Sequence, residues 1–228
     1  MSPLDAILQT LFPSICACCG NVLVHGERQI CLHCLTDLSA THYSGIADNP
    51  VERQLTGRIT FQAATALYHF RSDNTVRTAV HAMKFHRNTE LCLLMGRLMG
   101  LELLHSGRFD DIDCLVPVPL HWWRRLRRGF NQSELLCHGI ADVMQRPVCT
   151  HAVIRHRYTR QQSLQHHSNR SDNVEDAFRT RKPELLAGKH ILLVDDVMTT
   201  GATLTACADA LAAVPDLRIS VATFSTAQ

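Results

Sequence analysis

The sequence has no strong excess of charge of either sign and no hydrophobic run long enough to cross a membrane. Its 228 residues carry 23 Lys and Arg against 21 Asp and Glu, so the formal net charge is only +2. The longest apolar stretch, between Leu91 and Leu104, contains Arg97 and is shorter than the roughly 20 residues that a membrane-spanning helix needs. With 46% hydrophobic residues, the composition predicts a globular protein without membrane insertion.

The sequence also lacks internal repeats, low-complexity tracts and the Ser-His-Asp or Cys-His arrangements typical of nucleophilic catalysis. The N-terminal stretch MSPLDAILQTLFPSIC contains Asp5 and no basic segment, which is not the pattern of a secretory signal. We therefore expect a cytoplasmic protein. A chain of this length has room for one ordinary domain and a small additional module.

Half of the ten cysteines are crowded into one short segment between Cys16 and Cys34. In a reducing compartment this clustering indicates metal binding rather than disulfides. Cys16 with Cys19, and Cys31 with Cys34, form two CxxC pairs that together supply the four thiolates preferred by tetrahedral Zn²⁺. The sequence thus predicts a structural zinc site, because so small a segment has little core of its own.

Two alternatives to this ligand set stay open. The four cysteines could be unrelated, or a neighbour could replace one of them: Cys18, His25 or His33. The other five cysteines follow apolar helix or strand patterns and are expected to be small core residues: Cys92, Cys114, Cys137, Cys149 and Cys207.

Beyond the cysteine segment, helical patterns alternate with short apolar strand patterns. Helices are expected within 74–85, 89–104, 131–144 and 203–214, and strands within 59–70, 113–120, 190–197 and 219–226. This alternation predicts an α/β fold with a mostly parallel twisted sheet. We expect a zinc-ribbon-like module over 1–42, a linker over 43–57, where Gly, Pro, Asn and charge mix without periodicity, and the main domain over 58–228.

The stretch VDDVMTTGAT, residues 194–203, lies between a predicted buried strand and a predicted helix. Its loop therefore falls at the carboxyl end of a strand, where open α/β sheets bind ligands. Asp195 and Asp196 can accept hydrogen bonds from a vicinal diol or hold a hydrated Mg²⁺. The loop and helix start offer backbone N–H groups to a phosphate, at Thr199, Thr200, Gly201, Ala202 and Thr203. A sugar 5-phosphate fits these features, whereas a simple helix cap is the alternative.

The same string resembles the phosphoribosyl-diphosphate (PRPP) signature of type I phosphoribosyltransferases. The resemblance implies that Asp195 and Asp196 contact the ribose hydroxyls and that the loop from Thr199 to Thr203 cradles the 5-phosphate. It also implies that PRPP binds together with Mg²⁺. A loop after an earlier strand holds pyrophosphate in that family, and VPVPL, with Pro117 and Val118, lies in a suitable position.

Two further segments resemble the ComF family, whose members are linked to DNA uptake and natural transformation. The first is RGFNQ, from Arg128 to Gln132. The second, from Arg155 to Phe178, keeps the identity and spacing of several residues of that family, although His167 stands where we would expect an arginine. Its matching residues are Arg155, Arg157, Thr159, Gln162, Arg170, Asn173 and Phe178. A zinc module in front of a phosphoribosyltransferase-like domain is also the ComF arrangement, so the resemblance covers nearly the whole chain.

The middle third of the chain is rich in arginine. The planar guanidinium groups of Arg128, Arg155, Arg157 and Arg170 suit phosphate oxygens, and a solvated basic face is the alternative. Before them come two aromatic and three basic candidates for nucleic-acid binding: Trp122, Trp123, Arg124, Arg125 and Arg127. The tryptophans could stack on bases of single-stranded DNA or be buried anchors at the start of a helix.

Two functional hypotheses follow. The first is a ComF-like protein that handles single-stranded DNA during uptake, retains a PRPP site and docks a partner such as a helicase. The second is an active phosphoribosyltransferase that transfers the phosphoribosyl group of PRPP to an acceptor that the sequence does not identify.

Overall fold

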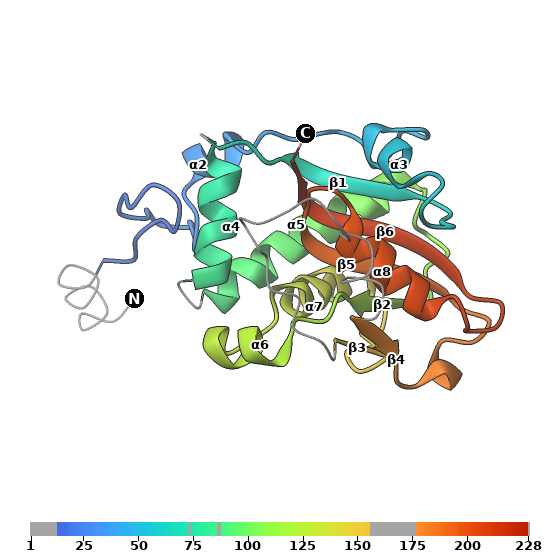
Figure 1. Ribbon diagram of the computed structural model, residues 1–228. Helices are drawn as coiled ribbons and strands as arrows, with labels where there is room; N and C mark the ends of the chain where they lie inside the picture. Colours follow the sequence, from blue (N-terminus) through green and yellow to red (C-terminus); the bar gives the residue numbers. More distant parts are fainter. Residues whose placement is uncertain (1–12, 73, 86–87, 156–176, 228) are drawn as a thin grey trace, which may run out of the picture.

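A four-stranded parallel sheet forms the centre of the protein. The computed structural model describes residues 13–72, 74–85, 88–155 and 177–227. The strand order is β1-β6-β5-β2, built from β1 (Ala64–His69), β6 (Arg218–Thr226), β5 (His190–Met198) and β2 (Cys114–Pro117). β3 (Val153–Arg155) and β4 (Phe178–Thr180) form a separate antiparallel pair (Figure 1). The predicted α/β class with a parallel sheet is confirmed.

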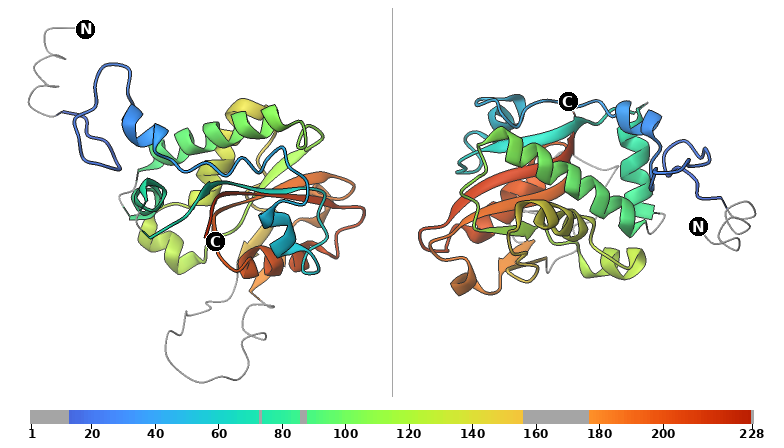
Figure 2. Two further views of the ribbon diagram at one scale, coloured as in Figure 1. Left: turned by 90° about the horizontal axis from the view of Figure 1, so that it is seen from above. Right: turned by 180° about the vertical axis from the view of Figure 1, so that it is seen from behind.

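Helices cover both faces of this sheet (Figure 2). One face packs against α4 (Thr75–Phe85), α5 (Thr89–Ser106) and α7 (Gln132–Met144), and the other against α3 (Pro50–Leu55) and α8 (Ala202–Leu211). Alternate residues of β5 supply the two cores: Leu192 and Val194 face the first, whereas Ile191 and Leu193 face the second. Burial on both faces explains why this strand is a continuous apolar run.

The shorter helices lie at the margins of these layers. They are α2 (Leu32–Thr36) in the cysteine segment, α6 (Trp122–Arg128) after β2, and the 3₁₀-helix η1 (Pro183–Leu185) before β5. No helix of the described ranges is both long and apolar enough to span a membrane.

Side chains at the helix ends explain where the two long helices begin. The side chain of Asn88 accepts a hydrogen bond from the Leu91 N–H at the start of α5, and that of Asn131 accepts one from the Ser133 N–H at the start of α7. These are N-caps, which satisfy backbone donors that a helix leaves unpaired. α5 ends at Gly107, whose φ of 66° is left-handed and favours glycine.

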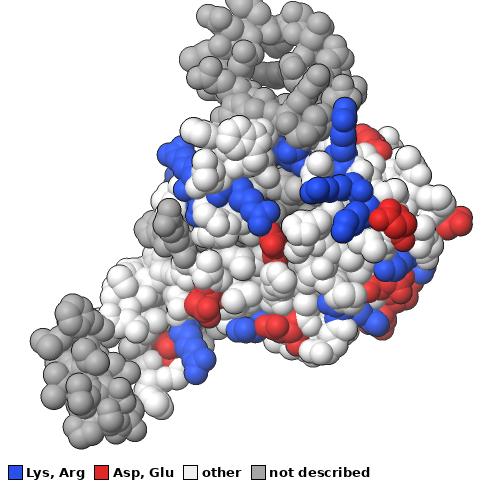
Figure 3. Space-filling view, turned by 90° about the horizontal axis from the view of Figure 1, so that it is seen from below, with Lys and Arg blue, Asp and Glu red and all other residues white. Residues whose placement is uncertain are grey.

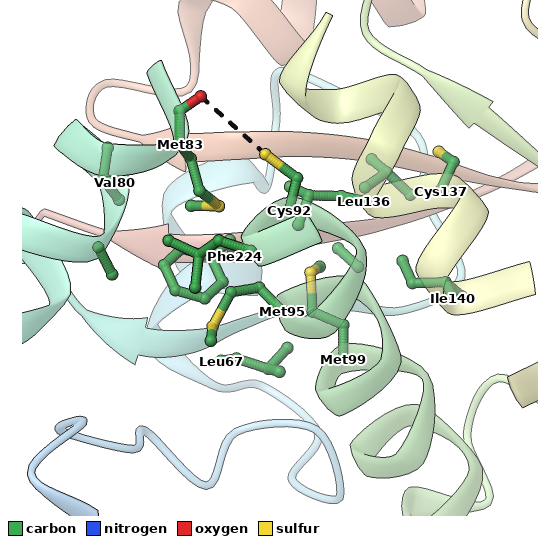
Figure 4. Packing of buried hydrophobic residues seen from close by; sticks show 14 of the residues in the cluster. Leu67, Val80, Met83, Cys92, Met95, Met99, Leu136, Cys137, Ile140 and Phe224 are labelled. Atoms are coloured by element: carbon green, nitrogen blue, oxygen red, sulfur yellow. Dashed lines mark hydrogen bonds between the residues drawn. The ribbon is translucent and has the colours of Figure 1, made fainter. Parts of the chain in front are cut away.

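The core between α4, α5, α7 and the sheet is rich in sulfur. Met83, Met95 and Met99 are fully buried, and the Cys92 thiol lies 4.0 Å from the Met83 carbonyl oxygen (Figure 4). Flexible thioether side chains fill irregular gaps in such cores. Four of the five cysteines expected in the core are buried, and the remaining one, Cys149, is half-buried.

Glycines bring α5 and α7 into close contact. A Cβ on Gly139 would lie 2.3 Å from the Leu93 carbonyl oxygen, and one on Gly96 would lie 2.4 Å from the Leu136 carbonyl oxygen. Both obstacles are backbone atoms, so the helices themselves would have to move apart. The two glycines therefore set the distance between α5 and α7.

Gly139→Ala is expected to destabilise the protein despite the better helix propensity of alanine. The propensity gain is about 1 kcal/mol, whereas overpacking a tight contact costs about 1 to 3 kcal/mol and occasionally more. Because the obstacles are backbone atoms, we expect the upper part of this range and a net loss of about 1 to 2 kcal/mol in a thermal or urea melt. Gly45→Ala is the control, because an added Cβ there meets nothing within 4 Å. Equal stability of the two variants would contradict the close packing.

Residues 43–57, expected as a linker, contain α3 and pack against the main sheet. Val51 and Leu55 are fully buried. The buried carboxylate of Glu52 accepts a hydrogen bond from the Ala64 N–H and pairs with Arg108 at 2.7 Å. Periodicity did not reveal this helix because it has only six residues, capped by Asn49.

Candidate functional sites

The four predicted zinc ligands come together in the structure. The sulfur atoms of Cys16, Cys19, Cys31 and Cys34 all lie within 4.8 Å of one another. The Cys19 and Cys31 sulfurs are 3.7 Å apart. A tetrahedron with Zn–S bonds of about 2.3 Å has sulfur atoms about 3.8 Å apart along each edge. The cluster can therefore hold a metal ion, and its four thiols suit zinc.

Backbone turns hold the thiols in position. The Cys31 and Cys18 N–H groups point to the Cys16 sulfur at 3.3 and 3.4 Å, and the Cys34 N–H points to the Cys31 sulfur at 3.4 Å. These donors favour thiolates, which are the form that binds metal. The proposed substitutes Cys18, His25 and His33 are not part of the cluster.

A second candidate site is a cleft at the carboxyl ends of β2 and β5. It has a volume of about 130 Å³, and larger hollows of about 530 and 290 Å³ elsewhere contain neither Asp195 nor Asp196. Residues from four helices (α4, α6, α7 and α8), from β3 and β5, and from adjoining loops meet here. The lining residues are Lys84, Val118, Pro119, Leu120, Arg124, Arg128, Asn131, Gln132, Ser133, Arg155, Asp195, Asp196, Val197 and Thr203.

The two carboxylates are already engaged by neighbouring groups. Asp195 Oδ1 accepts hydrogen bonds from the Ser133 hydroxyl at 3.0 Å and from the Asp196 N–H at 2.9 Å. Asp196 Oδ2 forms an ion pair with Lys84 Nζ at 2.9 Å. The pair does not act as a helix cap, because Gly201 is the N-cap of α8. With Asp196 neutralised by an amine, the pair fits direct Mg²⁺ binding poorly.

The environment of Asp195 disfavours its charged form. Burial and the adjacent charge of Asp196 raise the pKa of Asp195 to about 7, although the Asp196 N–H, Ser133 and Lys84 oppose the shift. Perturbed carboxyl groups of this kind concentrate at functional sites. The cleft is thus a candidate binding site on electrostatic as well as topological grounds.

The predicted phosphate loop follows β5 directly. Of its five residues, Thr203 lines the cleft, Thr199, Thr200 and Gly201 form the turn before it, and Ala202 is the first residue of α8. Gly201 has φ 77°, and an added Cβ would lie 2.9 Å from the Leu55 side chain, so the turn requires glycine.

Two side chains next to α3 bind the carbonyl groups of this loop. Gln54 Nε2 donates to the Thr199 oxygen at 2.6 Å, and Arg58 Nη1 donates to the Thr200 oxygen at 2.7 Å. Because these contacts come from about 140 residues away in the chain, periodicity and motif spacing gave no sign of them.

The predicted anion-binding residues separate into three groups. Val118, Arg128 and Arg155 line the cleft, whereas Pro117 is a buried residue at the end of β2. Arg157 and Arg170 lie outside the described residues. So do four others singled out in the sequence: Thr159, Gln162, His167 and Asn173.

Helix α6 stands beside the cleft and buries none of its own residues. Arg124 and Arg128 line the cleft, whereas Arg125 pairs with Glu134 at 3.6 Å. Trp122 is 61% exposed and Trp123 is 51% exposed. The hypothesis of buried tryptophan anchors is therefore wrong. Figure 3 shows Lys and Arg side chains gathered on the face of the molecule that carries α6.

Sequence reasoning missed three residues of the cleft: Lys84, Gln132 and Ser133. Gln132 and Ser133 lay in the segment that suggested the ComF resemblance, but they were interpreted only as the start of a helix. Lys84 ends a helical pattern whose inward residues are otherwise apolar. A cation at the end of that apolar pattern was the available signal.

The comparisons with known proteins match this architecture. The family described as "Phosphoribosyl transferase domain" matches residues 132–227, which include α7, β5, the loop and α8. The DNA utilization protein YhgH of Escherichia coli strain K12 is 38% identical over 135 residues, which are 58% of this chain and 59% of that protein.

Two competence proteins are also similar. Competence protein F of Haemophilus influenzae is 30% identical over 130 residues, 55% of this chain and 56% of that protein. Competence protein ComFC of Bacillus subtilis is 37% identical over 95 residues, 42% of this chain and 36% of that protein. The chain is thus similar to proteins named for DNA utilization and competence. It spans about six tenths of the length of YhgH.

Within this chain, the matched domain supplies only part of the cleft. Seven lining residues fall inside residues 132–227: Gln132, Ser133, Arg155, Asp195, Asp196, Val197 and Thr203. The other lining residues precede it, and they include Lys84 and Arg128. The cleft is therefore completed by the segment between the cysteine cluster and the matched domain.

Proposed function

We propose that this protein is a member of the ComF family that handles single-stranded DNA during DNA uptake and binds a phosphorylated sugar of the PRPP class in its cleft. The observation that carries this proposal is the adjacency of two surfaces. Helix α6 presents exposed tryptophans on one side, and its Arg124 and Arg128 line the cleft that holds the acidic pair. The names of its relatives, which refer to DNA utilization and competence, support the DNA role.

The chemistry of α6 suits a single strand. Bases stack on exposed aromatic rings in a sequence-tolerant way, and arginines beside the rings follow the phosphates. The exposed rings and Arg127 leave this helix accessible along its outer side. A helicase docked by the cysteine module remains part of the proposal, as does a cytoplasmic location. Its structural units are the zinc module over 1–42 and the main domain over 58–228, to which residues 43–57 with α3 are added.

Binding of single-stranded DNA is expected to depend steeply on salt. Each neutralised phosphate contributes about −0.7 to the slope of log K against log salt. The four arginines of α6 would therefore give a slope of about −3. Arg125→Gln with Arg127→Gln should flatten the slope by about 1.4. The measurement is fluorescence anisotropy of a labelled oligonucleotide over a salt series. Arg53→Gln, on the exposed surface of α3, is the control and should leave the slope unchanged.

Trp122→Ala separates stacking from charge in the same assay. Loss of one stacked base weakens binding by about 1 to 3 kcal/mol and leaves the salt slope unchanged. Because Trp122 is largely exposed, the melting temperature should not fall. Wild-type protein that binds no oligonucleotide at low salt would contradict the DNA role.

The second candidate is an active phosphoribosyltransferase, favoured by the intact acidic pair above a cationic cleft. In this case Arg124, Arg128 and Arg155 would stabilise the pyrophosphate leaving group electrostatically, and Mg²⁺ would accompany PRPP as its counter-ion. Release of pyrophosphate from PRPP in the presence of a base acceptor, with no binding of DNA, would favour the transferase over the DNA-handling function.

A further inference from the structure

Lys84 contributes a positive charge to the cleft from the last turn of α4. Its Nζ lies 2.9 Å from Asp196 Oδ2, and the two side chains are only 22% and 15% exposed. The buried residues of α4 are apolar, including Val80 and Met83. Partly buried ion pairs add little net stability, because desolvation offsets much of their attraction. Stability alone is therefore a poor explanation for this lysine.

The cleft carries excess positive charge before any ligand binds. Its lining contains four cationic side chains and two carboxylates, so the sum is 4 − 2 = +2 when both acids are ionised. The cations are Lys84, Arg124, Arg128 and Arg155. A net charge of +2 is the charge that neutralises one phosphate dianion. The protein itself therefore supplies the counter-charge for such a ligand.

A buried amide in the same lining also indicates a ligand. Gln132 is 1% exposed, and its Oε1 accepts a hydrogen bond from Arg128 Nη1 at 2.8 Å. Its Nε2 is buried and has no hydrogen-bond partner among the described residues. An unsatisfied buried donor costs about 1 to 3 kcal/mol. An acceptor oxygen on a bound molecule would remove this cost.

We propose that Lys84 is the built-in counter-cation of the acidic pair, and that it allows the cleft to bind a pentose phosphate without a divalent metal. This inference rests on the proposed phosphorylated-sugar site. An ammonium group has three N–H donors. One of these donors holds Asp196, and the other two remain for oxygen atoms of the ligand. Lys84 thus links the carboxylate to the sugar phosphate, a role that a metal ion would otherwise have.

The test is calorimetry with ribose 5-phosphate, which lacks the pyrophosphate that would bring its own Mg²⁺. Wild-type protein in EDTA is expected to bind it, and an excess of Mg²⁺ should change Kd less than about threefold. Lys84→Met should weaken binding in EDTA at least about tenfold, the effect of losing one charge-assisted hydrogen bond. Mg²⁺ should then restore part of the affinity. Lys182→Met, at an exposed position, is the matched control and should behave as wild type.

Lys84→Arg keeps the charge and guards against a folding defect in Lys84→Met, which leaves Asp196 without its cation. We expect Lys84→Arg to retain metal-independent binding within about tenfold of wild type. If wild type binds only with Mg²⁺, and both variants share that dependence, the role of Lys84 is overturned while the proposed site stands. Absence of binding to wild type with and without Mg²⁺ would overturn the proposed site as well.

Discussion

Cys31→Ser is expected to release the metal from the N-terminal module and to unfold it, while the central sheet stays folded. We propose that the module holds one structural Zn²⁺ per chain. Apparent binding free energies of such four-thiolate sites are about 10 to 16 kcal/mol, more than the stability of most small domains. Cys31 also caps α2 through its sulfur, so its loss affects both the metal and the helix.

Elemental analysis and hydrogen exchange together test this expectation. Wild type should contain one zinc per chain, and Cys31→Ser should contain little and lose protection in the module alone. Cys18→Ser is the matched control, because Cys18 neighbours the cluster but is not one of its four members. Wild-type protein without bound metal, or equal loss in the two variants, would contradict the assignment.

Asp195→Asn combined with Asp196→Asn is expected to abolish binding of PRPP without unfolding the protein. Amides accept weaker hydrogen bonds from hydroxyls than carboxylates do, and the change also removes the carboxylate that holds Lys84 in position. Calorimetry with PRPP measures the loss. Asp209→Asn, at an exposed position on α8, should bind as wild type, and a double variant with wild-type affinity would refute the role of the pair.

The pH dependence of stability gives an independent check on Asp195. Its pKa in the folded protein is raised above the ordinary value, so the folded state binds this proton more tightly than the unfolded state. The stabilisation that protonated Asp195 gives to the folded state is therefore lost as the pH rises from about 4 through 7. Asp195→Asn should remove this loss, and its melting temperature should exceed that of wild type more at pH 8 than at pH 5.

The sequence predicted most helices and strands well, but it did not predict which distant residues meet at the cleft. Residues close together in the chain determine the strand that carries Asp195, the helix capped by Asn131 and the cysteine pairs. Lys84 reaches Asp196 across more than a hundred residues, and only the parallel sheet order brings them together. The short helix α3 was missed because three buried residues establish no period.

The order of the strands also limits how this protein can be divided. The family match, residues 132–227, contains β5 and β6, which are the two inner strands of the sheet. Their outer neighbours, β2 and β1, come from earlier in the chain. A fragment cut at the limits of the match would expose two bare strand edges, which are templates for aggregation. The matched segment is thus not a self-sufficient unit for expression, and a shortened protein should keep everything from Tyr43 onward.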